Sequence, residues 1–296
     1  MSNQTFQLNK TLIKAAFNKA HTSYDEAAVL QREVANRLNE RLDFIKLQPQ
    51  TILEIGSGTG YYTQLLRIRY PNANIICLDI AHAMLASSRK KQSWLEKLRK
   101  KQHWLCADAE QLPLVENSVD MIVSNLTLQW CPQLQQTFNG IYNTLKPEGL
   151  FMFTTFGPDT LKELRASWRK VDDYNHVNAF LDMHDVGDTL LKAHFSDPVM
   201  DVENIVLTYQ EVMQLMRELK AIGAHNVTFG RQRGLTGKNK LNKLFNAYEA
   251  FRTEGRLPCT YEVVYGHAWK AAQHKDNNSP NENFIPVSAI QRKKPS

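Results

Sequence analysis

The sequence lacks the features that would place it in a membrane or outside a reducing compartment. No apolar run approaches the ~20 residues of a membrane-spanning helix, and the first twenty residues contain no apolar block followed by a cleavage site. The four cysteines, Cys77, Cys106, Cys131 and Cys259, lie far apart and have no metal-ligand spacing. We therefore expect a cytoplasmic protein without a metal, neither secreted nor membrane-inserted, whose cysteines are small apolar core residues.

The composition is that of an ordinary globular protein with an excess of positive charge. Hydrophobic residues make up 43% of the 296 residues and charged residues 22%, which is enough apolar material for a full core. The net charge of +6 suits a nucleic acid, an acidic membrane surface or an acidic protein partner, and does not choose among them. Between Arg89 and Lys101 there are seven cations and one acid. This basic run is either a solvated helix end or a docking surface for an acidic partner.

The clearest motif is Thr51-Ile-Leu-Glu-Ile-Gly-Ser-Gly-Thr-Gly60, an apolar run that ends in three glycines before a helical pattern. It predicts a strand, a tight turn and a helix N-terminus that faces a ligand, because glycine allows the required backbone angles and a close approach. A dinucleotide fingerprint needs its third glycine at position 61, which is tyrosine. Glu54 would repel a pyrophosphate but can help to orient an ammonium group. The motif therefore favours S-adenosyl-L-methionine, although similar glycine turns occur in many α/β proteins.

Acidic or polar residues follow three further apolar strands, in an order that suits the same cofactor. The strand 74–79 ends at Asp79, which can accept hydrogen bonds from both ribose hydroxyls or, alternatively, cap the next helix. Asp108 ends the strand 104–108 and can accept a hydrogen bond from the adenine amino group, while Met84 can lie on one adenine face or pack between helix and sheet. The predicted cofactor-binding residues are Glu54, Gly56, Ser57, Gly58, Gly60, Asp79, Ile80, Met84, Asp108, Ala109 and Asn125, the last of which follows the strand 119–124.

The hydrophobic periodicity predicts helices on either side of these strands. Residues 9–45 have the pattern of two helices broken near 21–25, where Phe17 and Tyr24 could cover the cofactor or simply pack as core residues. Further helices are expected near 135–145, 160–171, 184–195, 211–223 and 238–251, with strands at 150–156, 202–209 and 261–269.

The motifs from Glu54 to Trp130, in this order and spacing, resemble a class I S-adenosylmethionine-dependent methyltransferase. A closer resemblance, over roughly residues 9–270, is to the malonyl-acyl-carrier-protein O-methyltransferases of biotin synthesis. It rests on Lys14-Ala-Ala-Phe17 with Tyr24, Ser124 to Trp130, Phe153 to Phe156, Leu219 to Ala224 with Gly230-Arg231, and Leu257 to Tyr261. The basic run and the long polar tail depart from the family pattern.

This resemblance implies an α/β fold with a Rossmann-like sheet, helices on both faces, an N-terminal helical lid and a helical insertion before the last strands. The lid corresponds to residues 1–46, the methyltransferase domain to 47–270, and a disordered polar tail to 271–296. It also implies that the chain methylates the free carboxylate of a malonyl thioester carried by an acyl carrier protein, with no nucleic-acid or membrane partner.

The expected chemistry needs neither a metal nor a general base. A sulfonium is already a strong electrophile, and a malonyl carboxylate is ionised at neutral pH. Catalysis then depends on positioning, and on a selective grip on the carboxylate. Tyr24, Arg165 and Arg231 are the predicted positioning residues, with Lys220 as a further candidate cation. The alternative is that these cations form surface ion pairs.

Other functions fit parts of the sequence. Residues 159–165 also resemble a mitochondrial respiratory-complex assembly factor that is implicated in protein arginine hydroxylation, but the first nineteen residues contain no arginine, which disfavours a presequence. Intact cofactor motifs disfavour a non-catalytic binding module. Nucleic-acid methylation is disfavoured because the basic run has few stacking aromatics and no Asn-Pro-Pro-Tyr-type motif follows the fourth strand. Another small-molecule methyltransferase stays open.

Overall fold

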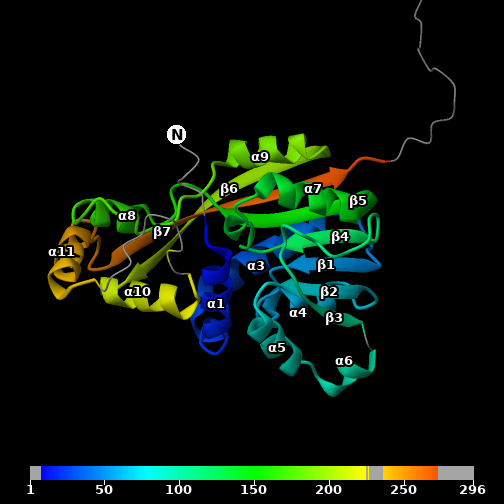
Figure 1. Ribbon diagram of the computed structural model, residues 1–296, viewed down its shortest axis with the longest axis horizontal. Coiled ribbons are helices and arrows are strands. Elements are labelled where there is room, and N and C mark those ends of the chain that lie inside the picture. Colours follow the sequence, from blue (N-terminus) through cyan, green and yellow to red (C-terminus); the bar gives the residue numbers. More distant parts are fainter. Residues whose placement is uncertain (1–7, 100, 225, 227–235, 273–296) are drawn as a thin grey trace, which may run out of the picture.

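The computed structural model describes residues 8–99, 101–224, 226 and 236–272 (Figure 1). One seven-stranded sheet runs through the molecule in the order β3-β2-β1-β4-β5-β7-β6. Strands β1 to β5 are parallel, and β7 is antiparallel to both β5 and β6. The bounds are β1 Thr51–Ile55, β2 Asn74–Asp79, β3 Gln102–Cys106, β4 Val119–Ser124, β5 Leu145–Phe156, β6 Phe195–Tyr209 and β7 Leu257–Lys270. The predicted α/β sheet is confirmed.

Helices cover both faces of this sheet, as predicted. On one face α3 (Val29–Arg41), α4 (Tyr61–Arg69), α8 (Lys162–Arg169), α10 (Val212–Ala221) and α11 (Lys238–Glu249) contribute to one apolar cluster. On the other face α7 (Leu134–Thr144) and α9 (Met183–Lys192) pack in a second cluster around Phe138 and Phe151. The remaining helices are α1 (Lys10–Ala20), α2 (Tyr24–Ala27), α5 (His82–Lys90) and α6 (Trp94–Arg99).

The parallel strands place their carboxyl ends along one edge, and this edge carries the predicted motifs. Strand β1 is hydrogen-bonded on both sides, to β2 and to β4, and residues 52–55 are fully buried, which is why its sequence is almost continuously apolar. The break between the two predicted N-terminal helices becomes a turn at 21–23 followed by the short α2. As a result, α1 and α2 lie beside the carboxyl edge of the sheet (Figure 1).

The structure differs from the sequence expectations at Cys106 and at residues 94–99. Cys106 is exposed, not a core residue, because β3 is an edge strand of the sheet. Residues 94–99 of the basic run form α6, a helix that the sequence did not predict. The predicted disordered tail lies outside the described residues from position 273 onward. Within the described ranges, no helix is both long and apolar enough to cross a membrane.

Candidate active site

The glycine loop forms the turn between β1 and α4, and its three glycines serve different purposes. Their φ angles are +73° at Gly56, +53° at Gly58 and +89° at Gly60, a region that other residues rarely adopt. A Cβ added at Gly56 would lie 1.9 Å from Oγ1 of Thr127, and one at Gly60 would lie 2.4 Å from Oγ of Ser88. At Gly58, no described heavy atom lies within 4 Å of that position. Gly56 and Gly60 are therefore needed for packing, whereas Gly58 leaves open space above the loop.

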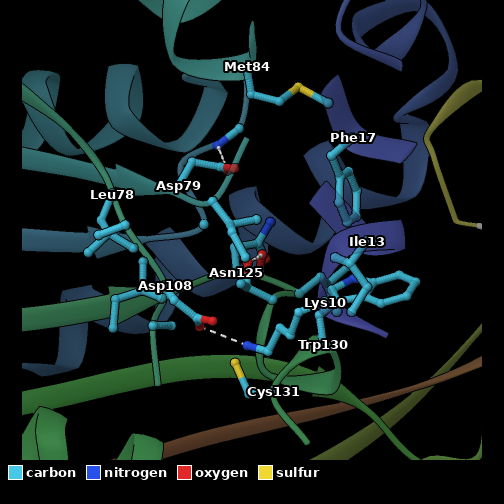
Figure 2. Close-up of a pocket in the computed structure, with 18 of the residues that line it drawn as sticks. Lys10, Ile13, Phe17, Leu78, Asp79, Met84, Asp108, Asn125, Trp130 and Cys131 are labelled. Carbon is cyan, nitrogen blue, oxygen red and sulfur yellow. Dashed lines mark hydrogen bonds and ion pairs between the residues drawn. The ribbon is translucent and has the colours of Figure 1, made fainter. Parts of the chain in front are cut away.

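This open space belongs to a cavity between the carboxyl edge of the sheet and the N-terminal helices (Figure 2). Of the predicted site residues, Tyr24, Gly56, Gly58, Asp79, Ile80, Met84, Asp108, Ala109 and Asn125 line it. Phe17, which the sequence placed either over the cofactor or in the core, also lines it. Residues that the sequence did not assign to the cofactor complete the wall, among them Lys10, Ile13, Leu126, Trp130 and Cys131. Lys10, Ile13 and Phe17 come from α1, so this N-terminal helix forms one wall of the cavity.

Asp79, at the end of β2, joins the glycine loop to α5. Its Oδ2 accepts a hydrogen bond from the Gly58 amide at 2.9 Å, and its Oδ1 accepts one from the Ala81 amide at 2.8 Å. Burial raises the pKa of this carboxyl to about 6, although the two amide donors oppose the shift. Asp79 therefore both stabilises the start of α5 and presents a carboxylate to the cofactor cavity.

Asp108 forms an ion pair with a residue that the sequence gave no reason to select. Nζ of Lys10, from α1, lies 2.7 Å from Oδ1 of Asp108 and 3.2 Å from Oε2 of Glu110 (Figure 2). The ammonium group thus ties the beginning of the lid to the end of β3. Nothing in the local pattern around Lys10 indicates this contact, since its partners lie about a hundred positions away in the chain.

Glu54, Ser57 and Gly60 were predicted to bind the cofactor but are absent from the described lining of the cavity. Glu54 is buried and accepts a hydrogen bond from Oγ1 of Thr63 in α4. Burial raises its pKa to about 8, so this carboxyl is largely protonated at neutral pH. Ser57 is buried within the loop, and Gly60 packs against Ser88 of α5. These three residues therefore do not belong to the described lining of the cavity, and a part for them in cofactor binding stays a prediction.

A second cavity adjoins the first and shares Phe17, Tyr24, Leu126 and Trp130 with it. The rings of Phe17 and Trp130 meet edge to face at 5.4 Å in this shared wall. From there the second cavity extends between the end of β5 and the helices α8 and α10, past His176, Asn178 and Tyr261. Its polar lining consists of Tyr24, Gln31, Gln129, Thr160, His176, Asn178, Asn226 and Tyr261.

Of the predicted cations that the structure describes, neither Arg165 nor Lys220 lines this second cavity. Arg165 donates from Nη1 to the Pro158 carbonyl at 2.8 Å and from Nη2 to the Thr160 carbonyl at 3.0 Å, so it holds the turn before α8. Lys220 is exposed. Of the residues that the structure describes, no lysine or arginine lines the second cavity. Arg231 lies outside the described residues.

Comparison with known proteins identifies the family. A family model described as "Methyltransferase domain" matches residues 53–153. The malonyl-[acyl-carrier protein] O-methyltransferase of Gallionella capsiferriformans is 52% identical over 90% of this chain and 93% of its own. The enzyme of the same name from Legionella pneumophila is 40% identical over 95% of this chain and 98% of its own. The chain belongs to the malonyl-[acyl-carrier protein] O-methyltransferase family. As a member of this family it is an S-adenosylmethionine-dependent methyltransferase.

Solved structures agree with this family at the level of the fold. The YcgJ protein of Bacillus subtilis aligns with a TM-score of 0.56 and 14% identity over 79% of this chain and 97% of its own. A putative methyltransferase from Bacillus halodurans aligns with a TM-score of 0.55 and 15% identity over 79% and 99%. The class I methyltransferase fold predicted for this O-methyltransferase family member is therefore confirmed.

The residues present fit S-adenosylmethionine. The open space at Gly58 admits a ligand against the main chain, where a side chain would be in the way. Asp79 and Asp108 provide carboxylate acceptors at the ends of two neighbouring strands, and the thioether of Met84 lies in the same wall. Asn125 is held in place, because its Nδ2 donates to the Gln31 carbonyl and its Oδ1 accepts from Oγ1 of Thr154.

Proposed function

We propose that this protein transfers a methyl group from S-adenosylmethionine to the free carboxylate of malonyl-acyl carrier protein, giving a methyl ester. The observation that carries the proposal is the shared wall of the two cavities, at Phe17, Tyr24, Leu126 and Trp130. A cofactor in the first cavity and an acyl group in the second would meet there. The near full-length identity to curated malonyl-[acyl-carrier protein] O-methyltransferases supports the choice of acceptor.

Four residues of the first cavity have a proposed part in holding S-adenosylmethionine. Asp79 accepts hydrogen bonds from the ribose hydroxyls and Asp108 accepts one from the adenine amino group, while Met84 contacts the adenine face. The main chain at Gly58 supports the methionine portion. When bound, the cofactor supplies an electrophilic methyl group on its sulfonium.

Tyr24 is the proposed donor to the acceptor carboxylate. Burial, together with the nearby carboxylate of Asp79, raises the pKa of this phenol, so it stays protonated and can donate from its hydroxyl. It lines both cavities at their junction. A neutral donor orients a carboxylate without withdrawing as much charge as a guanidinium would, so the oxygen remains nucleophilic.

The reaction then depends on positioning. The malonyl carboxylate is ionised at neutral pH, so no group of the protein needs to remove a proton. Holding its oxygen in line with the methyl group in a site closed by α1 and α2 can lower the barrier by roughly 7 to 11 kcal/mol. Because the carboxylate is masked as an ester, the product can enter fatty-acid-like elongation, which is the role in biotin synthesis that the family resemblance implies. A cytoplasmic location belongs to the same proposal.

The test is to incubate the protein with methyl-labelled S-adenosylmethionine and malonyl-acyl carrier protein. We expect label on the malonyl group that mild base releases as methanol, and no label on acetyl-acyl carrier protein, which lacks the free carboxylate. Label that resists base and lies on a protein arginine would favour the assembly-factor relatives instead. Cofactor binding without transfer to any malonyl thioester would contradict the proposed acceptor.

A further inference from the structure

We infer that the acyl arm enters the second cavity past His176 and Asn178, and that the acidic carrier protein docks on the adjacent basic face of α8 and α11. This α8–α11 face is formed by Arg169, Lys170, Lys238, Lys240 and Lys243. The inference rests on the proposed function, because it names where that partner binds.

The outer wall of the second cavity is built from two irregular segments. The first contributes His176, Val177, Asn178 and Phe180 to the lining, and the second, which follows α10, contributes Ile222, Ala224 and Asn226. The neighbouring residues 173–175 are exposed. The inner end of the cavity, by contrast, meets the cofactor cavity under α1. An arm that carries malonate to the cofactor must therefore approach from the outer wall, beside α8 and α11.

A chain of contacts connects this wall to both helices. The His176 ring stacks on that of Trp168 in α8, with centroids 3.6 Å apart and planes 6° from parallel. Its Nε2 lies 2.7 Å from Oδ1 of Asp172, whose Oδ2 accepts from Nζ of Lys240 in α11 at 2.8 Å. Burial raises the pKa of Asp172, but the hydrogen bonds from Lys240 and His176 outweigh it and hold the pKa at about 2. The wall and the basic face are thus one connected structure.

Asn178 provides an unused acceptor in this wall. Its Oδ1 is buried and has no hydrogen-bond partner within the part of the chain that the structure describes. A buried acceptor without a partner is destabilising, so such an atom indicates a ligand donor. The pantetheine arm of an acyl carrier contains two amides, whose N–H groups could satisfy this oxygen once the arm lies in the cavity.

The charge of the α8–α11 face fits an acidic partner. Segments 169–173 and 238–243 together carry five cations and two acids, and one of those acids, Asp172, is engaged by Lys240. The first turn of α11 contains no acidic residue, so Lys238 and Lys240 lie where the helix dipole disfavours cations. A solvated face gains nothing from this arrangement, whereas a surface that docks an acidic protein does.

The basic run at 89–101 is a weaker candidate for the same role. It lies on α5, α6 and the β3 edge, at the opposite end of the sheet from α11 (Figure 1), and its groove shares no lining residue with the second cavity. Two of its cations are engaged locally. Lys91 pairs with Asp25 at 2.6 Å, and Lys101 donates to the Asn72 carbonyl at 2.7 Å. A carrier bound there would present its arm far from the outer wall.

The experiment compares two double charge reversals with the same change in net charge. Arg169→Glu with Lys243→Glu alters the α8–α11 face, and Lys90→Glu with Lys97→Glu alters the basic run as the matched control. Initial rates are measured with malonyl-acyl carrier protein and with S-malonyl-pantetheine, which has no acidic surface. We expect the first variant to raise the apparent KM for the carrier about tenfold, with kcat and the pantetheine thioester unaffected, and the control to match the wild type.

The arm route is tested with Asn178→Ala, which should raise the KM for both thioesters several-fold because the arm is common to them. Unchanged carrier kinetics in the α8–α11 variant, or a rise in KM only in the basic-run variant, would overturn the docking face. Unchanged KM values for Asn178→Ala would overturn the arm route. If the wild type methylates neither thioester, the proposed function itself fails. If the wild type methylates both thioesters, unchanged KM values in the variants contradict this inference and leave the proposed function intact.

Discussion

At the scale of single residues, Gly58 permits the sharpest test of the cofactor cavity. A Cβ at this position would point into open space at a positive φ, so we expect Gly58→Val to fold with a cost of about 1–2 kcal/mol and to lose measurable binding of S-adenosylhomocysteine by calorimetry. Gly255 is the matched control, because it also has a positive φ of +76° with no described atom within 4 Å of its Cβ position, but it lines no described cavity. Gly255→Val should lose similar stability and keep its affinity. Equal affinity in both variants would remove Gly58 from the site.

Asp79 should make the stability of the ligand-free protein depend on pH. Its pKa rises from 3.8 to about 6 on folding because of burial. The folded state therefore holds the proton more tightly than the unfolded state. The stabilising contribution of Asp79 to folding is greatest below pH 4 and is lost as the pH rises through about 6. Keeping the buried Asp79 carboxylate charged at pH 8 therefore costs on the order of 3 kcal/mol of folding stability.

The substitution Asp79→Asn removes the cost of a buried charged carboxylate at pH 8, and it also removes one proposed hydrogen-bond acceptor for the cofactor. We expect the variant to be at least as stable as the wild type at pH 8 in urea unfolding, with a flatter pH profile between 4 and 7. It should bind S-adenosylhomocysteine more weakly by about 1.5–3 kcal/mol, because a charge-assisted hydrogen bond is lost. Wild-type affinity together with a lower stability would show that Asp79 only stabilises the turn before α5.

The residue scale also shows what a sequence can and cannot reveal. Gly58, Asp79 and Asp108 were predictable because each lies at a fixed distance from a strand end, and parallel strands bring those ends together. Lys10 and Asn178 were not, because their positions depend on how distant segments pack. The hydrogen bond between Glu54 and Thr63 was not predictable for a related reason, since motif spacing gives proximity to a site but not the direction of a side chain.

At the scale of elements, the lid is held to the glycine loop by a small polar cluster. Asp25 in α2 accepts from Oγ1 of Thr59 at 2.5 Å and pairs with Lys91 at 2.6 Å, and Nζ of Lys91 also donates to the Thr59 carbonyl at 3.0 Å. The side chains of Asp25 and Lys91 are 48% and 36% exposed, so solvent weakens the pair. Such a contact can close a lid without preventing its opening.

We therefore expect Asp25→Ala to speed the release of S-adenosylhomocysteine about two- to fivefold, as the loss of up to ~1 kcal/mol implies, with little change in melting temperature. Stopped-flow fluorescence measures the rate. Asp43→Ala is the control, because Asp43 forms a comparable exposed ion pair with Arg69, lies outside α1 and α2, and lines neither cavity. Similar release rates in the two variants would show that this cluster does not hold the lid.

The element pattern was predictable where apolar periodicity was regular, and less so elsewhere. The helix near 135–145 and the strand 74–79 agree with α7 and β2 within a residue or two. Strand β6 begins at Phe195, well before the expected 202, because its partner β7 pairs with it through a register shift between Ser196 and Val199. A bulge of this kind interrupts the alternation that sequence reasoning depends on.

At the scale of the whole molecule, the shared wall should couple the two cavities. Phe17 comes from α1 and Trp130 from the segment after β4, and their ring contact faces both sites. Ordering these side chains costs conformational entropy. A ligand that orders the shared wall from one cavity therefore reduces this entropy cost for a ligand in the other cavity. By thermodynamic linkage the effect must be reciprocal.

We expect S-adenosylhomocysteine to bind more tightly, by about fivefold or more, when S-malonyl-pantetheine is present, and the thioester to gain the same factor from S-adenosylhomocysteine. Isothermal titration calorimetry of both orders of addition measures this factor.

Phe17→Ala should reduce this coupling factor toward one, because the variant removes the ring that faces both ligands. Phe180→Ala is the control, since Phe180 lines the second cavity but not the first, and it should weaken thioester binding while leaving the coupling factor in place. A coupling factor of one in the wild type would mean that the two cavities are occupied independently, and that the lid closes on the cofactor without preparing the acceptor site.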